Sequence, residues 1–121
     1  MTLEGFSNSG ADWLPELKPY IENENVVIAS PHKVFGPQTN DLILQLHKHL
    51  INNVIIAGIL ANMCVESHLR DLIEQGFEVI VVSDATAGPI TTMGDGYAAT
   101  IVNYQYLAHE VALTKDTIAK M

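Results

Sequence analysis

Hydrophobic residues cluster in short runs that the sequence predicts to be buried β-strands. Three of them are VVIAS at 26–30, NVIIAG at 53–58 and FEVIVVS at 77–83. Each run is rich in valine or isoleucine and is nearly continuous, rather than alternating with polar residues. This pattern is typical of strands that are covered on both faces, as in a parallel sheet. HEVALT at 109–114 predicts a last short strand.

Two stretches between these runs have the spacing of amphipathic helices. In the first, residues 39–52, aliphatic side chains recur on one helical face, and Thr39 or Asn40 is placed to cap the N-terminus. Residues 64–75 carry a similar stripe, and Gly76 follows where a helix commonly ends in a left-handed conformation. Strands and helices therefore alternate, which predicts a layered α/β fold with a mainly parallel sheet.

The two ends of the chain carry weaker signals. After a loop-like segment at 88–96, Asp95 is expected to cap a third helix that extends to Leu107, and a short helix is expected after Thr114. Two prolines near the start predict a short helical turn and irregular chain at 11–21. No repeat or linker divides the sequence, so we predict a single domain over residues 1–121.

Composition and charge argue against several classes of protein, namely membrane-spanning, secreted and nucleic-acid-binding proteins. The 121 residues suffice for one core, and no apolar run approaches the roughly 18 residues that a membrane span needs. The first residues lack the basic and apolar regions of a signal peptide, so we expect a cytoplasmic protein. A net charge of −8 argues against binding to nucleic acid or to anionic membranes. The expected partner is a small molecule or another protein.

The chain contains one cysteine, Cys64, at the junction between the strand at 53–58 and the helix that follows. Ligands of parallel α/β sheets bind beyond the carboxyl ends of the strands, which is where this thiol is placed. At the start of a helix, unpaired backbone N–H groups and the helix dipole would favour the reactive thiolate. A lone cysteine is also commonly a packed core residue, so both roles stay open on these grounds.

Basic and imidazole side chains supply further candidates. Lys33 lies just past a predicted strand; beside the cysteine it would stabilise a thiolate or an oxyanion, and alternatively it is a solvated surface cation. His47 and His49 are two residues apart on a predicted helix and so do not share a face, and no metal site is predicted. His32 and His68 are placed to approach the edge of the pocket, and alternatively they have the commoner role of surface histidines on a loop and on a helix.

Three stretches together resemble the isochorismatase-like cysteine hydrolase superfamily, which includes nicotinamidase-related amidases. They are SPHKVFGPQTNDL from Ser30, NVIIAGILANMCVES from Asn53 and GFEVIVVSDATA from Gly76. The closing GDGYAATIVNYQYLAHEVALT is similar to the last helix and strand of many members. The resemblance extends from about Trp13 to the end of the chain, and residues 58–66 are its most specific part.

The resemblance implies a three-layer, Rossmann-like α/β domain with helices on both faces of the sheet, in which a cysteine, a lysine and an aspartate form the site. Cys64 matches the cysteine and Lys33 matches the lysine. Members have a cis peptide bond shortly before the cysteine, which by position implies the bond between Leu60 and Ala61. The backbone N–H groups of Ala61 and Cys64 would form the oxyanion hole, and Phe35 is expected to line the substrate pocket.

The reaction that the resemblance implies is attack of the thiolate on a small, non-peptide amide, release of the amine, and hydrolysis of a thioester. The aspartate would accept the thiol proton, and Lys33 would hold the thiolate. Nicotinamidases also bind a metal through a cluster of Asp and His residues upstream of the lysine strand. This sequence has no such cluster, so neither a metal nor another cofactor is expected.

The aspartate of the family ends a first strand, and no residue ahead of Lys33 lies in the pattern of that strand. We therefore expect a domain that lacks its first strand and helix, and a homo-oligomer that buries the apolar surface exposed by this lack. One alternative is that residues 1–25 supply a substitute strand, with Asp12 or Glu16 as the proton acceptor. Another is a non-catalytic remnant or interaction partner that keeps the fold and the thiol.

Overall fold

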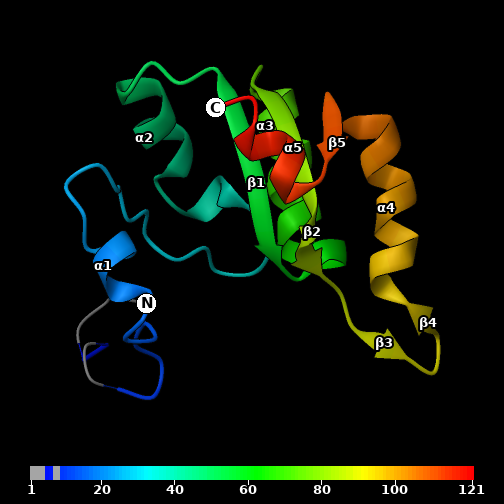
Figure 1. Cartoon of the computed structure of the whole chain (residues 1–121), viewed down its shortest axis with the longest axis horizontal. Coiled ribbons are helices and arrows are strands. Elements are labelled where there is room, and N and C mark those ends of the chain that lie inside the picture. The colour runs from blue at the N-terminus through cyan, green and yellow to red at the C-terminus, as the bar shows by residue number, and fades with distance from the viewer. Residues whose placement is uncertain (1–4, 7–8) are drawn as a thin grey trace.

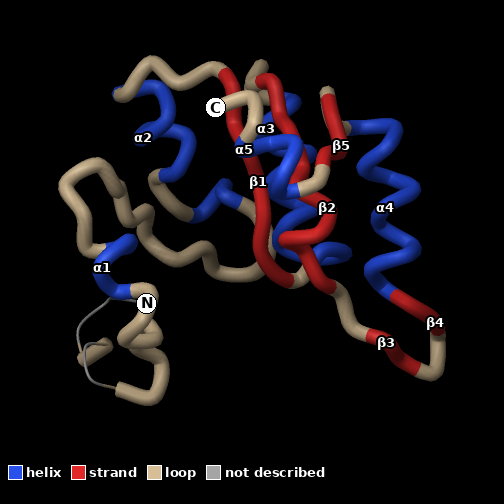
Figure 2. Tube along the Cα trace, in the orientation of Figure 1, coloured by secondary structure: helices blue, strands red, loops and turns tan. Residues whose placement is uncertain are grey.

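Three parallel strands form the centre of the fold in the computed structural model, which describes residues 5–6 and 9–121 (Figure 1). β1 (Asn53–Ile59) pairs with β2 (Glu78–Ala87), and β2 pairs with β5 (Glu110–Ala112). Figure 2 shows the three strands side by side. The parallel α/β sheet expected from the sequence is therefore confirmed, and with it the strands predicted near 53–58, 77–83 and 109–114.

Helices cover both faces of this sheet. Val79 and Val81 of β2 are fully buried on one face, where they pack with side chains of α3 (Glu66–Glu74) and α4 (Gly96–Leu107). On the other face lies the short α5 (Thr114–Ile118), in front of the strands in Figure 1. Alternate residues of a strand point to opposite faces, so the near-continuous valine and isoleucine run of β2 is buried from both sides.

One predicted strand, residues 26–30, is wrong. No strand forms there, and Val26, Val27 and Ile28 are all exposed. In Figure 1 this segment lies between α1 (Lys18–Ile21) and α2 (Leu42–Lys48), apart from β1. A strand needs a neighbour for its N–H and C=O groups, and none of the described strands lies beside this segment.

The helix predicted at 39–52 is shorter than expected, because α2 spans only Leu42–Lys48 after a 3₁₀ turn at Pro37–Thr39. The side chain of Asn40 accepts a 3.0 Å hydrogen bond from the N–H of Leu42, as expected of a capping residue. Leu50 ends the helix with a φ of 55°, and the N–H of Ile51 donates to the carbonyl of Leu46 at 3.0 Å. The sequence does not predict this end, since the left-handed position usually belongs to glycine.

The later capping predictions are confirmed. Gly76 has a φ of 90° at the end of α3, and the Asp95 carboxylate accepts hydrogen bonds from Tyr97 and Ala98 at the start of α4. The segment predicted as a loop at 88–96 contains a small hairpin of β3 (Ile90–Thr91) and β4 (Gly94–Asp95), which projects from the body of the fold in Figure 1.

Residues 1–4 and 7–8, part of the segment that argued against a signal peptide, lie outside the described residues. Over 5–6 and 9–121, no helix has both the length and the apolar character that a membrane crossing requires.

Candidate active site

The cysteine lies just past the carboxyl end of β1, as the sequence predicts. It is the fourth residue of a π-helix, Ala61–Val65, which continues directly into α3. The carbonyl of Leu60 accepts hydrogen bonds from the N–H groups of Met63 and Val65, at 3.0 and 3.2 Å. The helical segment therefore begins three residues earlier than predicted, and Cys64 sits in its first turn rather than at its first residue.

A buried tyrosine fixes this π-helix against α4. The hydroxyl of Tyr104 donates a 2.6 Å hydrogen bond to the carbonyl of Ala61, and both residues have no exposed surface. Burial raises the pKa of Tyr104 to about 12, so the phenol stays a neutral donor. The π-helix is thus anchored at its first residue, three residues before the thiol.

The end of β1 departs from a regular strand. Its register against β2 shifts between Ile56 and Gly58, and Gly58 has a φ of 124°, which glycine adopts more readily than any other residue. The cis peptide bond lies between Ile59 and Leu60, so the predicted position, between Leu60 and Ala61, is wrong by one bond. Leu60 is the N-cap of the π-helix and Ala61 its first residue, so the predicted bond already belongs to the helix.

The thiol lines an open pocket at this edge of the sheet. Residues 56–59 of β1 form one wall, and His32, Val65 and His68 complete the lining. The sulfur lies 4.0 Å from the backbone oxygen of Val34, so the segment after residue 30 passes directly over the cysteine. The structure therefore brings together Cys64 and the stretch that contains the predicted lysine.

Two imidazoles meet in the same pocket. The Nδ1 atom of His68 lies 2.7 Å from the carbonyl oxygen of Cys64, one helical turn earlier. The ring of His32 packs edge-on against that of His68, with 5.2 Å between the centroids. The Nδ1 atom of His32 is buried and has no hydrogen-bond partner among the described residues. In the same part of the chain, no group of three His, Cys, Asp or Glu side chains is arranged to hold a metal ion.

The predicted lysine belongs to the segment that passes over the cysteine, but no hydrogen bond within the described residues joins its side chain to the thiol. Lys33 is exposed, and its backbone N–H donates to the hydroxyl of Thr39 at 2.9 Å. Its ammonium group forms no ion pair or hydrogen bond with any residue that the structure describes. Val34, the next residue, makes the contact with the thiol.

A carboxylate holds the segment before the lysine in place. Asp41 accepts hydrogen bonds from the side chain of Gln45 and from the N–H and hydroxyl of Ser30, at 2.8–3.0 Å. These bonds lower the pKa of Asp41 to about 2. The bond from Gln45 has the largest effect, followed by those from Ser30. Asp41 therefore connects the start of α2 to the chain that leads to His32.

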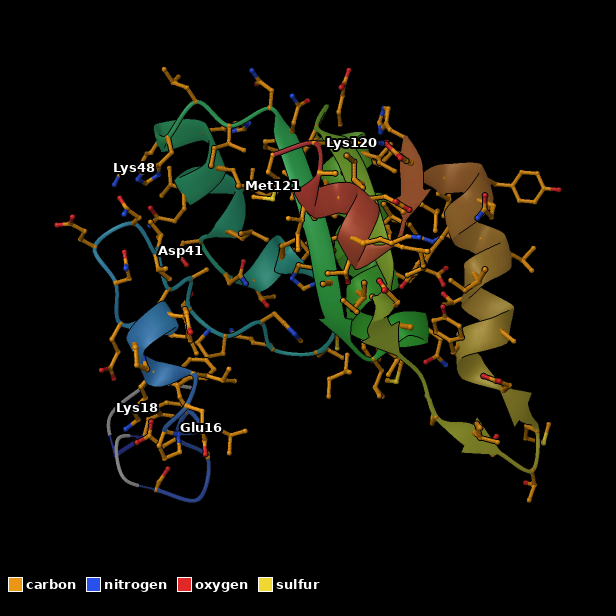
Figure 3. All side chains as sticks on the ribbon, in the orientation of Figure 1. Glu16, Lys18, Asp41, Lys48, Lys120 and Met121 are labelled. Atoms are coloured by element: carbon orange, nitrogen blue, oxygen red, sulfur yellow. The ribbon has the colours of Figure 1, made fainter. Side chains whose placement is uncertain are left out.

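Neither of the suggested acids lies at the site. Asp12 bonds to Lys18 at 2.8 Å. Figure 3 shows Glu16 and Lys18 together near α1, far from the end of β1. Over residues 5–6 and 9–121, no carboxylate forms a hydrogen bond with Cys64 or with the Lys33 side chain. The alternative in which Asp12 or Glu16 accepts the thiol proton therefore does not hold.

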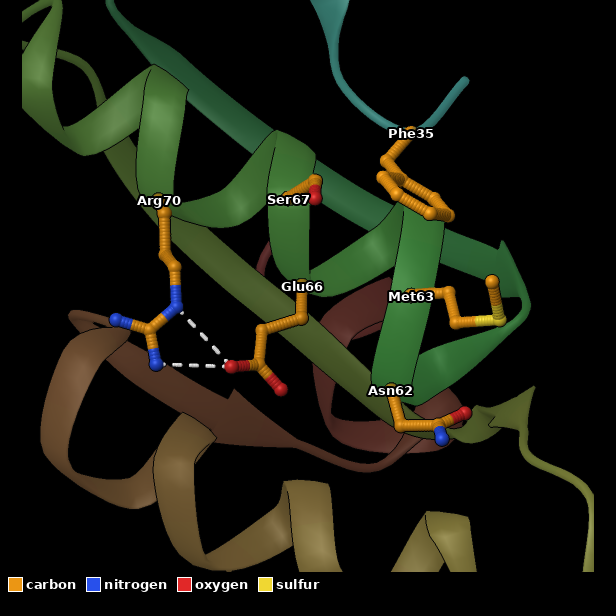
Figure 4. Close-up of a pocket in the computed structure, with 6 residues that line it drawn as sticks. All are labelled: Phe35, Asn62, Met63, Glu66, Ser67 and Arg70. Atoms are coloured by element: carbon orange, nitrogen blue, oxygen red, sulfur yellow. Dashed lines mark hydrogen bonds and ion pairs between the residues drawn. The ribbon is translucent and has the colours of Figure 1, made fainter.

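Phe35 lines a second pocket, on another side of the π-helix (Figure 4). Its neighbours there include Asn62, Met63 and the ion pair of Glu66 and Arg70, which are 2.8 Å apart. This pocket does not include the thiol. The prediction that Phe35 contacts the substrate stays a prediction.

The contacts that support the site have no signal in the sequence. Tyr104 lies within the predicted third helix, and nothing in the sequence pairs it with Ala61, 43 residues earlier. The i, i+4 spacing of Cys64 and His68 was a usable signal, because such residues share one face of a helix.

Comparisons with known proteins agree with this architecture. The isochorismatase domain family matches residues 4–116. An isochorismatase-like hydrolase from Alkaliphilus metalliredigens is 24% identical, with a TM-score of 0.75, over 95% of this chain and 61% of that protein. A cysteine hydrolase from Pseudomonas syringae pv. phaseolicola is 25% identical, with a TM-score of 0.71, over 80% of this chain and 49% of that protein.

A nicotinamidase from Bacillus subtilis is also similar, with 20% identity and a TM-score of 0.69 over 81% of this chain and 53% of that protein. The chain thus spans between about half and three-fifths of the length of these three solved proteins. Because the family match extends over nearly the whole sequence, the chain belongs to the isochorismatase family.

Proposed function

We propose that this chain carries the nucleophile of a cysteine hydrolase that cleaves a small, non-peptide amide through a thioester, and that Cys64 is that nucleophile. The observation that supports it most is the position of the only cysteine, past the carboxyl end of β1 in an open pocket. Nicotinamidase is among the similar proteins, which favours a C–N bond as the target.

In the proposed reaction, the thiol gives its proton to a base and the sulfur bonds to the amide carbonyl carbon. The C–N bond then breaks, and the amine leaves with a proton. Water attacks the resulting thioester, the C–S bond breaks, and the acid and the free thiol are released. The N–H groups of Ala61 and Cys64 are the proposed oxyanion donors, since the first turn of a helix leaves such groups without helical partners.

Lys33 is proposed to stabilise the thiolate, and Phe35 to contact the substrate. Support for the lysine is indirect, because it is the neighbouring Val34 that touches the sulfur. The side chain of Lys33 is long enough to reach a sulfur atom that lies against the neighbouring residue. Lys33→Ala should slow turnover and should slow alkylation of Cys64. Lys48→Ala, an exposed lysine on α2 labelled in Figure 3, is the matched control and should change neither.

Release of ammonia from a panel of primary amides, nicotinamide included, tests the function. We expect Cys64→Ala to abolish release, and mass spectrometry of the quenched wild-type reaction to show an acyl group on the chain. Turnover that survives in Cys64→Ala would contradict the proposal. A folded wild-type chain that releases no ammonia and gains no acyl group would favour the non-catalytic alternative. That alternative also has one observation in its favour, because the ammonium of Lys33 has no ion-pair partner among the described residues.

We propose further that the protein is a cytoplasmic homo-oligomer. Ile55 and Ile59 of β1 are 45% and 70% exposed, and no described strand covers the outer edge of β1. Exposed apolar strand edges are commonly buried by association. Light scattering at tens of micromolar, about the range of weak association, should give a mass above that of one chain, and a monomer would contradict the proposal.

A further inference from the structure

The stretch of chain that carries the thiol is bonded to α4 at the first residue of the π-helix. The hydroxyl of Tyr104 donates a 2.6 Å hydrogen bond to the carbonyl of Ala61, and neither residue has exposed surface. Inside the core no solvent competes for this carbonyl, so the bond is strong and directional. The peptide group after Ala61 therefore has a fixed orientation against α4.

The same stretch is bonded to α4 a second time, at Glu66, two residues after the thiol. The Glu66 carboxylate accepts hydrogen bonds from the hydroxyl of Thr100 at 2.5 Å and from the side-chain amide of Asn103 at 3.1 Å. A hydroxyl has one proton, which Thr100 gives to Glu66 rather than to the carbonyl of Ala61, 3.5 Å away. Arg70 donates to the carboxylate from α3, at 2.8 and 3.0 Å (Figure 4). Glu66 is thus held by both helices.

The three donors of α4 share one face of that helix. Thr100, Asn103 and Tyr104 are three and four residues apart, which places their side chains side by side. The start of the helix also comes close to the π-helix, because a Cβ atom at Gly96 would lie only 2.7 Å from the side chain of Asn62. α4 therefore meets the thiol-bearing stretch at several points, on both sides of the cysteine.

Acyl transfer depends on the exact placement of a nucleophile. The sulfur must approach the carbonyl carbon from one direction, and N–H donors must meet the oxygen as its charge develops. A displacement of about 1 Å in such a site can cost about 10²-fold in rate. A backbone that is bonded on both sides of the thiol meets this requirement.

We propose that Tyr104 and Glu66 are positioning residues, which hold Cys64 and the N–H groups beside it in the alignment that acyl transfer requires. The inference rests on the proposed cysteine-hydrolase function. The pocket that contains the thiol is lined by other residues, so both act through the backbone. Tyr104 acts through the carbonyl of Ala61, and Glu66 through the helical segment to which it belongs.

The test compares two reactions of the same thiol. With p-nitrophenyl acetate, the thiolate sulfur bonds to the acetyl carbon and p-nitrophenolate leaves, which passes through an oxyanion and needs the alignment. With iodoacetamide, the sulfur displaces iodide from a CH₂ group, and no oxyanion forms. Intact mass after quenching gives both rates, and Cys64→Ala corrects for modification at other residues.

The variants remove one bond to α4 at a time. Tyr104→Phe removes the hydroxyl and Glu66→Ala the carboxylate, whereas Glu66→Gln keeps an oxygen that can accept from Asn103. Tyr106→Phe, exposed on α4, and Glu74→Ala, exposed at the end of α3, are the matched controls. Thermal melts establish that each variant is folded. If Glu66→Ala does not fold, Tyr104→Phe and Glu66→Gln decide the test.

We expect acylation of Tyr104→Phe and Glu66→Ala to be about ten- to a hundredfold slower than that of the wild type, with alkylation within about twofold of it. Glu66→Gln should fall between Glu66→Ala and the wild type, and both controls should match the wild type. For an amide that the wild type cleaves, kcat should fall while KM stays unchanged. A role in stability alone would move neither rate in a variant that is folded.

Folded variants that are acylated at the wild-type rate overturn the inference. Variants whose alkylation slows as much as their acylation overturn it as well, since access to the thiol would then be what changed. A wild-type thiol that is alkylated but never acylated has the same consequence. Ammonia release that persists in Cys64→Ala instead defeats the proposed function, while the two rates still decide on Tyr104 and Glu66.

Discussion

The hydroxyl of Tyr104 and the carbonyl of Ala61 form a 2.6 Å hydrogen bond inside the core, and this bond joins α4 to the π-helix that carries the cysteine. Replacing Tyr104 by Phe keeps the ring and removes only the donor. We expect the free energy of unfolding to fall by about 1 kcal/mol, the usual net value of such a bond. Urea denaturation measures this loss.

Tyr106→Phe is the control for that measurement, because Tyr106 lies on the same helix and is 86% exposed. Its stability should equal that of the wild type. The anchoring role of Tyr104 also predicts faster hydrogen exchange in the π-helix of Tyr104→Phe. If the two variants unfold at the same urea concentration, the hydroxyl bond contributes nothing measurable.

Glu66 links α3 to α4 and should make stability depend on pH. Burial works against its charge, but hydrogen bonds from Thr100, Arg70 and Asn103 outweigh this effect and lower the pKa of Glu66. A pKa lowered in the folded state adds stability above the unfolded value of about 4.3, and this is lost as the pH falls through the folded value. Glu66→Gln should therefore lose less stability than the wild type between about pH 5 and pH 3.

Chemical denaturation at several pH values gives these free energies. Glu74→Gln, at the exposed C-terminal end of α3, is the matched control and should keep the wild-type dependence on pH. Parallel curves for Glu66→Gln and the wild type would mean that the carboxylate is no better stabilised in the folded chain than in the unfolded one.

The sequence predicted the elements whose signals are local. Asp95 caps α4 and Gly76 ends α3 because short-range hydrogen bonds and backbone freedom decide both. The prediction of a strand at 26–30 was wrong because a strand depends on a neighbouring strand from elsewhere in the chain, which no local pattern reveals. The end of α2 was not predicted either, because a leucine, Leu50, takes the left-handed position in which glycine is usual.

The site shows the same division. The position of Cys64 at a strand end follows from the order of elements, and the structure agrees with it. The chemistry around the thiol depends on which segment passes over it, and this proved to be residues 32–34, through His32 and the carbonyl of Val34. The partner of the thiol also could not be predicted, since it is the backbone carbonyl of Val34, while the ammonium of Lys33 forms no hydrogen bond or ion pair within the described residues.

Asp41 should titrate at an unusually low pH. Its pKa is about 2 because Gln45 and Ser30 donate hydrogen bonds to the ionised carboxylate. These bonds hold above the unfolded value of about 3.9 and weaken as the pH falls towards 2. Carboxyl chemical shifts in a ¹³C NMR titration measure the value directly. Asp41→Ala should speed hydrogen exchange at the Ser30 amide, whereas Asp116→Ala, on the exposed face of α5, should leave it unchanged.

Leu50 offers a stabilising substitution. It has a φ of 55° and is 86% exposed, so its side chain gains little from packing while its backbone occupies a region that is unfavourable for residues with a Cβ atom. Leu50→Gly removes that strain at some cost in unfolded-state entropy, and we expect a net gain of about 0.5–1 kcal/mol in the free energy of unfolding. Leu44→Gly is the matched control, because Leu44 is also exposed but lies inside α2, where glycine should cost about 1 kcal/mol. Urea denaturation of the two variants should therefore move the midpoint in opposite directions, and a shift of both to lower urea would show that the left-handed turn at Leu50 is not what limits the stability of this helix end.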